Sequence, residues 1–443
     1  MSGNRTSAPQ NMGLRYTLLA LVLPALFIVE WINGGPNAAL GILNMGLISA
    51  ILALGVNLQW GYAGLFNVGI VGFIALGGLA PVLVAMPPTE GAMVAGGWRI
   101  ALALLAGAAA IALAVAVNRR APRKARIIAL PALAVAGFVV YRLIFDPGVA
   151  AVQAINPSAT GYLGGLGLPT LLAWPLGAAL AAGAAWAIGK TALGLRSDYL
   201  AIATLGIGEI IVAVLKNEEW LSRGVMNVNG IPRPWPVPYE IDIQADLAFV
   251  ERAASLGLDP VTASTVLVKL LYTALFAAVL VTLIWLSQRA LNSPWGRMMR
   301  AIRDNEISAA AMGKDVTRRH LQIFILGSAV CGLAGAMLIS LDGQMIPSGY
   351  NPLRYTFLIW VMVIVGGSGN NWGSVVGGVL IWYLWIKAEV WGPQIMDLVT
   401  ASMPPGDLKS HLLDSAAHMR LLVMGLVLIL MLRFSPSGLL PER

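Results

Sequence analysis

The sequence carries little charge for its length. Asp, Glu, Lys and Arg make up 11% of its 443 residues, whereas roughly 25% is usual in soluble domains. Hydrophobic residues make up 58% of the chain, and its mean hydropathy is +0.77. This composition excludes a soluble globular protein and indicates an integral membrane protein. The net charge of +8 is divided among short loops between apolar runs, which fits a lipid surface and argues against nucleic acid as a partner.

Cysteine and histidine are nearly absent. The single cysteine, Cys331, lies in an apolar run, which excludes an intrachain disulfide and a cysteine-based metal site. The three histidines, His320, His411 and His418, do not have the spacing of a metal-ligand set. We therefore predict no metal site and no cofactor bound by this chain.

Motifs for catalysis and nucleotide binding are missing as well. Gly189-Lys190-Thr191 ends like a phosphate-binding loop, but alanine stands where the first glycine of that motif is required, at Ala184. Paired carboxylates and a nucleophile elbow are not found either. We therefore predict that the chain is not an enzyme. If it moves a solute uphill, the energy must come from an ion gradient or from another subunit.

What the chain does have is a series of apolar runs, each about as long as a bilayer is thick. They predict an all-α, polytopic integral membrane protein with ten to twelve transmembrane helices. The two runs that are glycine-rich or short, 66–86 and 353–368, are predicted to be broken or re-entrant. The twelve candidate spans are 14–33, 37–57, 66–86, 98–117, 126–145, 168–189, 198–216, 264–288, 320–341, 353–368, 373–392 and 415–434.

The loops between the spans differ in charge. The loop 118–126 has five basic residues and no acidic one, and 289–319 has seven basic and three acidic residues. The loop 217–262 has seven acidic and three basic residues. Because basic loops stay in the cytoplasm, the first two are predicted to be cytoplasmic and 217–262 extracytoplasmic, with both termini cytoplasmic.

The segment 293–313 is the longest charged, helix-forming stretch of the chain. Ser293 and Pro294 are typical of a helix start, a second start is expected at Asp304 or Asn305, and Gly313 is typical of a helix end. We predict two short helices that form a docking surface on the cytoplasmic side. The alternative is a basic loop that only sets the topology.

Two glycine-rich corners, 61–69 and 366–373, each join two apolar runs. They predict either helix breaks beside a transport pathway or close packing of small residues. Asp198 and Glu209, eleven residues apart, share one face of a predicted helix. Because an ionisable group is costly inside a membrane, we expect Glu209 to be buried and hydrogen-bonded. Its face would line a pathway or bind a neighbouring helix, or its carboxylate would be satisfied by the backbone donors of a broken helix.

Five stretches, taken together and in this order, resemble the permease subunit of branched-chain amino-acid ABC importers, the LivM type. They cover the chain from about residue 40 to its end. The family also includes permeases for urea and short amides, and Asn67 and Ile70 depart from its usual pattern. The apolar pair 98–145 is expected to be an extra hairpin. The five stretches are 54–69, 195–210, 293–313, 365–373 and 434–440.

The resemblance implies a single permease domain over 1–443 in the bacterial inner membrane. It implies a second, related permease chain, two cytoplasmic ATPase subunits that bind ATP and magnesium, and a periplasmic substrate-binding protein. A self-sufficient, ion-coupled transporter is the rival from another class. The residues expected to couple to the ATPase are Arg297, Arg300, Ile302, Arg303, Asp304, Glu306, Ala309, Ala310 and Gly313. Those expected at the pathway or a helix break are Asn57, Gly61, Gly64, Asn67, Gly69, Asp198, Thr204, Glu209, Gly366 and Gly367.

Overall fold

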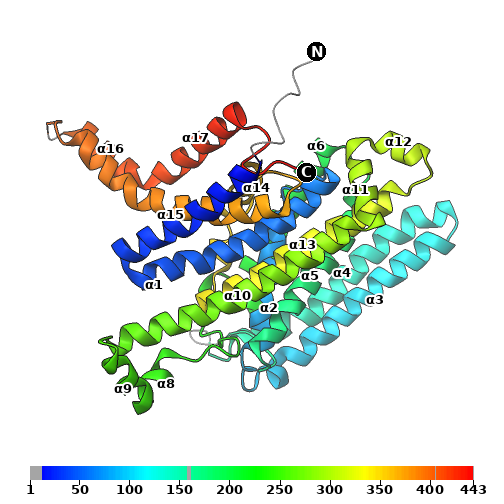
Figure 1. Cartoon of the computed structure of the whole chain (residues 1–443). Helices are drawn as coiled ribbons and strands as arrows, with labels where there is room; N and C mark the ends of the chain where they lie inside the picture. The colour runs from blue at the N-terminus through cyan, green and yellow to red at the C-terminus, as the bar shows by residue number, and fades with distance from the viewer. Residues whose placement is uncertain (1–11, 157–160, 405, 443) are drawn as a thin grey trace.

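A computed structural model describes residues 12–156, 161–404 and 406–442, and nearly all of its regular structure is helical (Figure 1). The two strands described, β1 (Val228–Asn229) and β2 (Gln344–Met345), pair in antiparallel fashion. The longer helices are α1 (Met12–Ala63), α2 (Ile70–Ala85), α3 (Trp98–Arg120), α4 (Arg123–Gln153), α5 (Ala173–Ala192), α6 (Ser197–Asn217), α10 (Pro260–Asn292), α11 (Pro294–Asp304), α13 (Val316–Asp342), α15 (Asn371–Thr400) and α17 (Met419–Phe434). The shorter ones are α7 (Glu219–Ser222), α8 (Glu240–Ala245), α9 (Leu247–Ser255), α12 (Glu306–Ala311), α14 (Leu358–Gly366) and α16 (Asp407–Asp414), with the single turns η1 (Met93–Gly97), η2 (Thr170–Leu172), η3 (Gly224–Met226), η4 (Pro347–Gly349), η5 (Leu353–Phe357) and η6 (Ser415–His418).

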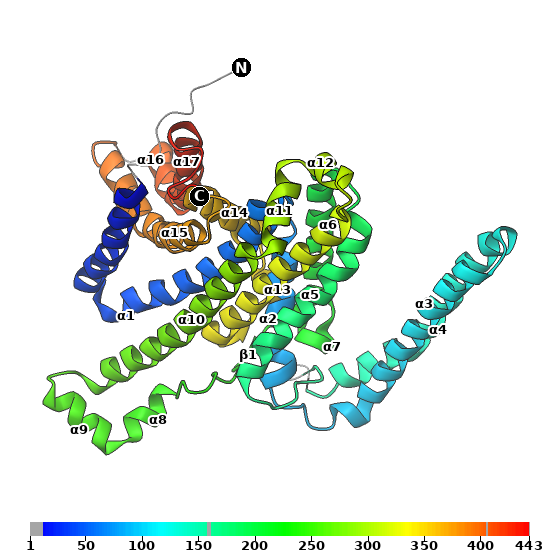
Figure 2. The ribbon, with the colours of Figure 1, turned by 45° about the vertical axis from the view of Figure 1, so that its right-hand side comes forward.

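Eight helices of the described chain are long and apolar enough to cross a membrane, and the bent pair α16 and α17 makes a ninth. One of the eight, α1, contains the first two predicted spans, because its backbone is kinked at Gly35 (φ 79°) before Pro36. Figure 2 shows the two halves of α1 as a V. The predicted broken runs 66–86 and 353–368 form the shorter apolar helices α2 and η5–α14. The prediction of an all-α, polytopic membrane protein is confirmed.

The core of the bundle depends on small residues, because α13 packs directly against α1, α2 and α5. A Cβ atom added to Gly332 of α13 would collide with Ala181 and lie 2.6 Å from the carbonyl oxygen of Gly177 on α5. A Cβ atom on Gly77 of α2 would in turn collide with the carbonyl oxygen of Gly332. Three backbones therefore meet here with no side chain between them, as in other membrane helix contacts.

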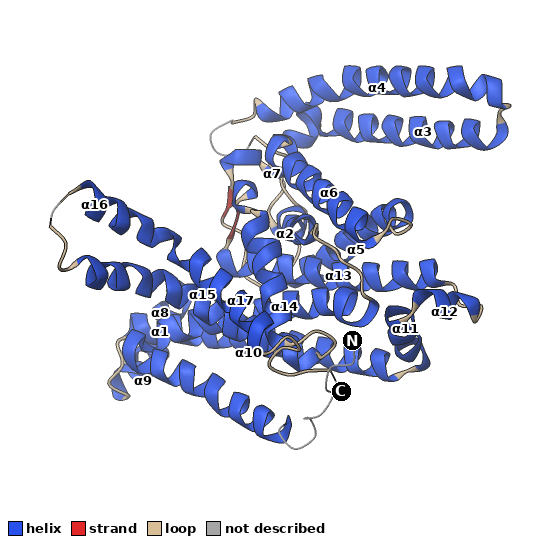
Figure 3. Ribbon diagram, turned by 90° about the horizontal axis from the view of Figure 1, so that it is seen from above, coloured by secondary structure: helices blue, strands red, loops and turns tan. Residues whose placement is uncertain are grey.

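The antiparallel helices α3 and α4 contain the predicted hairpin region 98–145 and stand apart from the bundle (Figures 2 and 3). They are attached at one end, where the ring of Phe145 packs edge-on against that of Trp220 with centroids 5.7 Å apart. The turn between α3 and α4 lies at the same end of the molecule as α11 and α12, whereas α8 and α9 lie at the other end (Figure 1). The two basic loops thus share one end, and the acidic loop occupies the opposite end.

The close contact at Gly332 predicts opposite effects for two chemically identical substitutions. Gly332→Ala should lower the free energy of unfolding by about 1–3 kcal/mol, because α5 and α13 must move apart. Gly183→Ala, on α5 where nothing lies within 4 Å of the new Cβ, should leave stability unchanged or raise it by up to about 1 kcal/mol. Thermal unfolding of the purified variants in detergent measures both. Equal melting temperatures would contradict the tight packing described here.

Candidate functional site

The first glycine corner lies between α1 and α2 and is held by hydrogen bonds of two buried side-chain amides. The Asn67 side chain accepts a hydrogen bond from the Gly69 amide (3.0 Å) and donates to Oε1 of Gln59 (2.9 Å). Gln59 in turn donates to the carbonyl oxygen of Phe324 (3.0 Å) and to Oγ of Ser328 (2.9 Å), both on α13. Asn67 is 1% exposed and Gln59 2%. The break after α1 is therefore attached to the central helix α13 by buried side-chain hydrogen bonds.

Helix α6 crosses the same corner at close range. The amide of Val68 donates to Oγ1 of Thr204 (3.1 Å). A Cβ on Gly69 would collide with the carbonyl oxygen of Thr204, and a Cβ on Gly208 would lie 3.0 Å from Cα of Gly69. The structure thus brings together Asn67, Gly69 and Thr204, which the sequence analysis selected from distant parts of the chain.

The second glycine corner, between α14 and α15, contacts the first through Asn57. Its Oδ1 accepts from the Gly369 amide (2.8 Å), and its Nδ2 donates to Oδ1 of Asn371 (3.3 Å). Asn57 is fully buried. A Cβ on Gly61 would lie 2.5 Å from the Gly369 nitrogen, so only glycine fits there. The two corners therefore form one continuous site.

The C-terminal tail completes the second corner. The amides of Leu439 and Leu440 donate to the carbonyl oxygens of Val365 (2.8 Å) and Gly366 (3.0 Å). The backbone of Gly367 has φ 113°, a value that side chains disfavour, and its Cα lies against Gly438. The tail is thus part of the site.

The segment 293–313 forms the two short helices that its sequence predicts, α11 and α12. Asn305 caps α12, because its side chain accepts from the Ser308 amide (2.9 Å), and Gly313 has φ 76° after its end. Ser293 precedes α11 as expected, but its hydroxyl donates to the carbonyl oxygen of Ala290 (2.6 Å) and does not cap the helix.

The two helices expose a different set of residues from the one expected. Ile302 is 1% exposed and Ala309 9%, and both pack inward in a cluster with Val316. The expectation that they belong to a docking surface is wrong for these two, because they attach the short helices to α13. The outer face instead presents two large apolar side chains, Ile307 (83% exposed) and Met312 (80%). The residues that are also exposed there are Arg297, Asp304, Glu306, Ala310, Ala311 and Gly313.

Arg303 joins the short helices to both glycine corners. Its guanidinium donates to the carbonyl oxygen of Gly61, which lies in the last turn of α1 and lacks an intrahelical donor. It also pairs with the carboxylates of Glu442 in the tail (2.9 Å) and Asp304 (3.2 Å). The Arg303 side chain is 22% exposed, and such charge-assisted contacts are stronger where water is partly excluded. A movement of α11 would therefore act on both corners at once.

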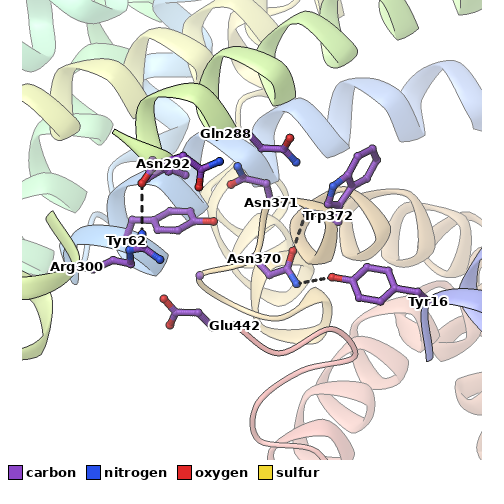
Figure 4. A pocket seen from close by; sticks show the side chains of 11 residues that line it. Tyr16, Tyr62, Gln288, Asn292, Arg300, Asn370, Asn371, Trp372 and Glu442 are labelled. Atoms are coloured by element: carbon purple, nitrogen blue, oxygen red, sulfur yellow. Dashed lines mark hydrogen bonds between the residues drawn. The ribbon is translucent and has the colours of Figure 1, made fainter. Parts of the chain in front are cut away.

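A polar cavity of about 400 Å³ opens beside Arg303, between α1, α10, α11 and the second corner (Figure 4). The Arg300 and Glu442 side chains line it with opposite charges, and Arg300 donates to the carbonyl oxygen of Leu291 (3.4 Å). Asn370 caps α15 from the cavity wall and donates to the Tyr16 hydroxyl (3.1 Å). The remaining lining residues are Tyr62, Gln288, Asn292, Gly369, Asn371 and Trp372.

The structure does not place the two acids of α6 in the site. Glu209 is exposed on the surface of this chain and makes no hydrogen bond or ion pair with any described residue, so the prediction of a buried, hydrogen-bonded side chain is wrong here. The inward face of α6 is formed by residues such as Thr204 and Gly208, which lie about 140° and about 100° around the helix from Glu209. Asp198 is exposed in the first turn of α6. Within the described ranges, no three His, Cys, Asp or Glu side chains form a group that could hold a metal ion.

Gln59 was not selected from the sequence, although a polar residue in an apolar run is a signal. Gln59→Leu should lower the free energy of unfolding by about 2–4 kcal/mol, because it leaves Nδ2 of Asn67 buried without an acceptor and removes the hydrogen bonds to the Phe324 carbonyl and to Oγ of Ser328. The matched control is Gln288→Leu, since Gln288 makes no hydrogen bond within the described chain, and it should change stability by less than about 1 kcal/mol. Thermal unfolding in detergent distinguishes the two. A stable Gln59→Leu variant would mean that the amide network is not what holds the corner.

The family described as "Branched-chain amino acid transport system / permease component" matches residues 127–432, more than half of the chain, including α11, α12 and the second corner. LivM of Escherichia coli K12, a high-affinity branched-chain amino acid transport system permease protein, is 26% identical over 298 residues, or 66% of this chain. A probable LivM of Methanocaldococcus jannaschii is 26% identical over 249 residues, or 56% of this chain.

These matches cover 62% and 61% of the two LivM proteins, so the chain spans about three fifths of their length. A shorter match, 29% identical over 115 residues, covers 25% of this chain and 31% of the fructose import permease protein FrcC of Rhizobium meliloti. No solved structure gives a significant match. The resemblance drawn from the five sequence stretches is confirmed, and the chain belongs to the branched-chain amino acid transport system permease family.

Proposed function

We propose that this chain is the permease subunit of an ATP-driven importer for branched-chain amino acids, and that it lines the transport pathway by alternating access. Family membership and the LivM relatives support this proposal. The single observation that carries it is the linkage at Arg303, which connects an exposed pair of short helices to two breaks in the helical bundle. A self-contained channel or scaffold has no need for such a connection.

The exposed side chains on α12 support an ATPase subunit as the partner at this end. Ile307 and Met312 form a small apolar surface with Ala310 between basic residues, which suits a helix lying in a groove. The sequence has no nucleotide-binding motif of its own, so ATP and magnesium would be bound by two such ATPase subunits. This end would be cytoplasmic, together with both termini, in a bacterial inner membrane.

Two further partners follow from the same proposal. Glu209 lies exposed in a membrane-spanning helix, where an uncovered carboxylate is costly, and this favours a second permease chain packed against α6. The loop 217–262 at the opposite end would be the docking site of a periplasmic substrate-binding protein. The acidic side chains of this loop would lie at the edge of that contact.

The proposed mechanism is a population shift between two states. Closure of the ATPase subunits on ATP would move α11 and α12 as one body, because Ile302 packs them together. Arg303 would transmit this movement to Gly61 and to the tail at Glu442. The corners can respond because glycine backbones meet there without side chains between them. The chain itself would catalyse no covalent step.

Two alternatives are tested by the same assay. A permease for urea or short amides would share the whole architecture and differ in the solute. An ion-coupled transporter would need buried carboxylates on the pathway, and the exposure of Glu209 and Asp198 argues against it. The complex reconstituted in liposomes with binding protein and ATPases should take up leucine, isoleucine or valine only with ATP. Uptake by the purified chain alone, driven by an ion gradient, would contradict the proposal.

A larger side chain on the exposed face of α12 should impair ATPase binding and uptake more than the loss of a positive charge on α11. Ala310→Trp should release the ATPase subunits or reduce uptake by at least about tenfold. Arg300→Gln should have a smaller effect, because Arg300 lines the cavity instead of the exposed face and makes no ion pair within the described residues. Ala125→Trp, exposed in the other basic loop, is the control and should leave both unchanged. Co-purification and substrate-stimulated ATPase activity measure the effect. An intact complex with Ala310→Trp would show that 293–313 only anchors the topology.

A further inference from the structure

One ion pair of the described chain lies between two membrane-spanning helices and takes no part in the site above. It joins Glu30 of α1 to Lys387 of α15, and these side chains are 7% and 14% exposed. Both helices are long and apolar enough to cross a membrane. Charged side chains in such helices are costly and are usually paired or functional. The pair therefore needs an explanation beyond the general packing of the bundle.

The residues around the pair leave room for it and extend the contact. Gly34 lies one turn after Glu30, and a Cβ atom at Gly34 would lie 2.5 Å from Oε1 of Glu30. The Lys387 ammonium lies 5.9 Å from the ring centroid of Tyr383. That ring packs edge-on against the ring of Phe27, with centroids 5.8 Å apart. The two helices therefore share a specific contact over about one helical turn.

Residues 12–34 of α1, the N-terminal arm, are not fixed by the rest of that helix. The backbone leaves the helical conformation at Gly35 (φ 79°), and Pro36 has no amide hydrogen to continue the hydrogen-bonding pattern. An apolar groove of about 680 Å³ lies between the arm and the second half of α1, with Phe27 and Trp31 on one side and Leu40 on the other. The arm therefore depends on other helices for its position.

Apolar contacts alone fix such an arm poorly inside a membrane. Lipid chains are as apolar as the side chains of the arm, so burying those side chains against protein brings little hydrophobic gain. Packing and polar contacts between helices are what remain. Polar contacts join the arm to α15 and its cap at both ends. One is the pair of Glu30 with Lys387, and the other is a hydrogen bond of 3.1 Å from Asn370 to the Tyr16 hydroxyl (Figure 4).

The contact at Tyr16 connects the arm to the second corner and the tail. Asn370 caps α15 and also donates to the carbonyl oxygen of Pro441 in the tail (3.1 Å). The next residue of the tail, Glu442, pairs with Arg303. A displaced arm would therefore take a partner away from the residue that holds the second corner to the tail.

We propose that Glu30 and Lys387 are positioning residues for transport, because their ion pair keeps the N-terminal arm on α15 and Tyr16 at the second corner through the transport cycle. The inference rests on the import function proposed above and gives a role to the arm, which precedes the part of the chain matched by the family. A pair that only contributed to stability would be replaceable by two neutral side chains, since removing both charges leaves no unpaired charge buried. A positioning pair is not replaceable in this way.

The first test measures the position of the arm and does not depend on transport. Spin labels at Leu18→Cys and Val390→Cys, two exposed positions, report the distance between the arm and α15, while the native Cys331 is buried and stays unlabelled. With the native ion pair, the purified complex should give one narrow distance distribution, with and without ATP. Glu30→Gln/Lys387→Met should lose the narrow peak, and the charge swap Glu30→Lys/Lys387→Glu should restore it.

The second test measures leucine uptake by the reconstituted complex. Glu30→Gln/Lys387→Met should reduce it by at least about tenfold while the complex still assembles and hydrolyses ATP, and the charge swap should restore most of it. Tyr16→Phe, which removes the hydroxyl at the second corner, should reduce uptake several-fold. The control is Glu389→Gln/Arg420→Gln, which removes a more exposed ion pair of α15 and should leave uptake unchanged.

The two tests separate failure of this role from failure of the proposed function. A neutral double variant that keeps the narrow distance distribution and wild-type uptake would overturn the positioning role and leave the pair a role in stability alone. A distance that changes when ATP is added to the chain with the native pair would overturn it as well. A complex that takes up none of leucine, isoleucine and valine, but whose arm is released when the pair is removed, would overturn the transport proposal alone. If the neutral double variant does not fold, the charge swap and Tyr16→Phe decide the outcome.

Discussion

The guanidinium of Arg303 contacts three separate segments of the chain: the end of α1, the end of α11 and the C-terminal tail. Gly61 is in the last turn of α1, Glu442 lies in the C-terminal tail, and Asp304 closes α11. Only arginine has several donors in one rigid plane that can reach a carbonyl and two carboxylates together. A positive charge at the end of α1 also suits the helix dipole. Apolar contacts at Met299 and Ile302 also attach α11, but in the described chain the charged contacts to Gly61 and Glu442 come from Arg303.

The remainder of the site follows from a second constraint, the lack of water inside a membrane bundle. Every break in a helix exposes backbone groups that need partners from the protein. Thr204 and Asn67 accept from the backbone amides of the first corner, and Asn57 and Asn370 accept from those of the second. The few buried amides of a very apolar chain are therefore gathered where its helices are interrupted, and the interruptions are where movement can occur.

The sequence predicts the helices well because the features that determine them are local. Apolar runs define the spans, and Pro294, Asn305 and Gly313 mark the ends of the short helices. The glycine corners were also predictable, since clustered glycines in apolar surroundings have few other uses. Charge and helix-end signals located the segment 293–313, and the family resemblance supplied its expected role, which spacing alone left open.

The direction in which a side chain faces could not be predicted in the same way. In a span that is apolar on all sides, nothing in the sequence tells which face meets the bundle, so Glu209 was expected inside and lies outside. Ile302 of α11 and Ala309 of α12 were expected to couple to the ATPase, but in this chain both side chains pack inward with Val316. Gln59 stands out in the sequence as a polar residue in an apolar run, but its role becomes clear only when its partners Phe324 and Ser328 on α13 are known.

The most direct test of this account concerns Arg303 in the reconstituted complex. The quantity to measure is the number of ATP molecules hydrolysed per substrate molecule imported. With Arg303→Gln, the ATPase subunits should remain bound and hydrolyse ATP, but uptake should fall by at least about tenfold, because the link to Gly61 and Glu442 is lost. Arg297→Gln, at an exposed position of the same helix, should leave the ratio unchanged. An unchanged ratio with Arg303→Gln would show that the movement of the short helices reaches the bundle by another route.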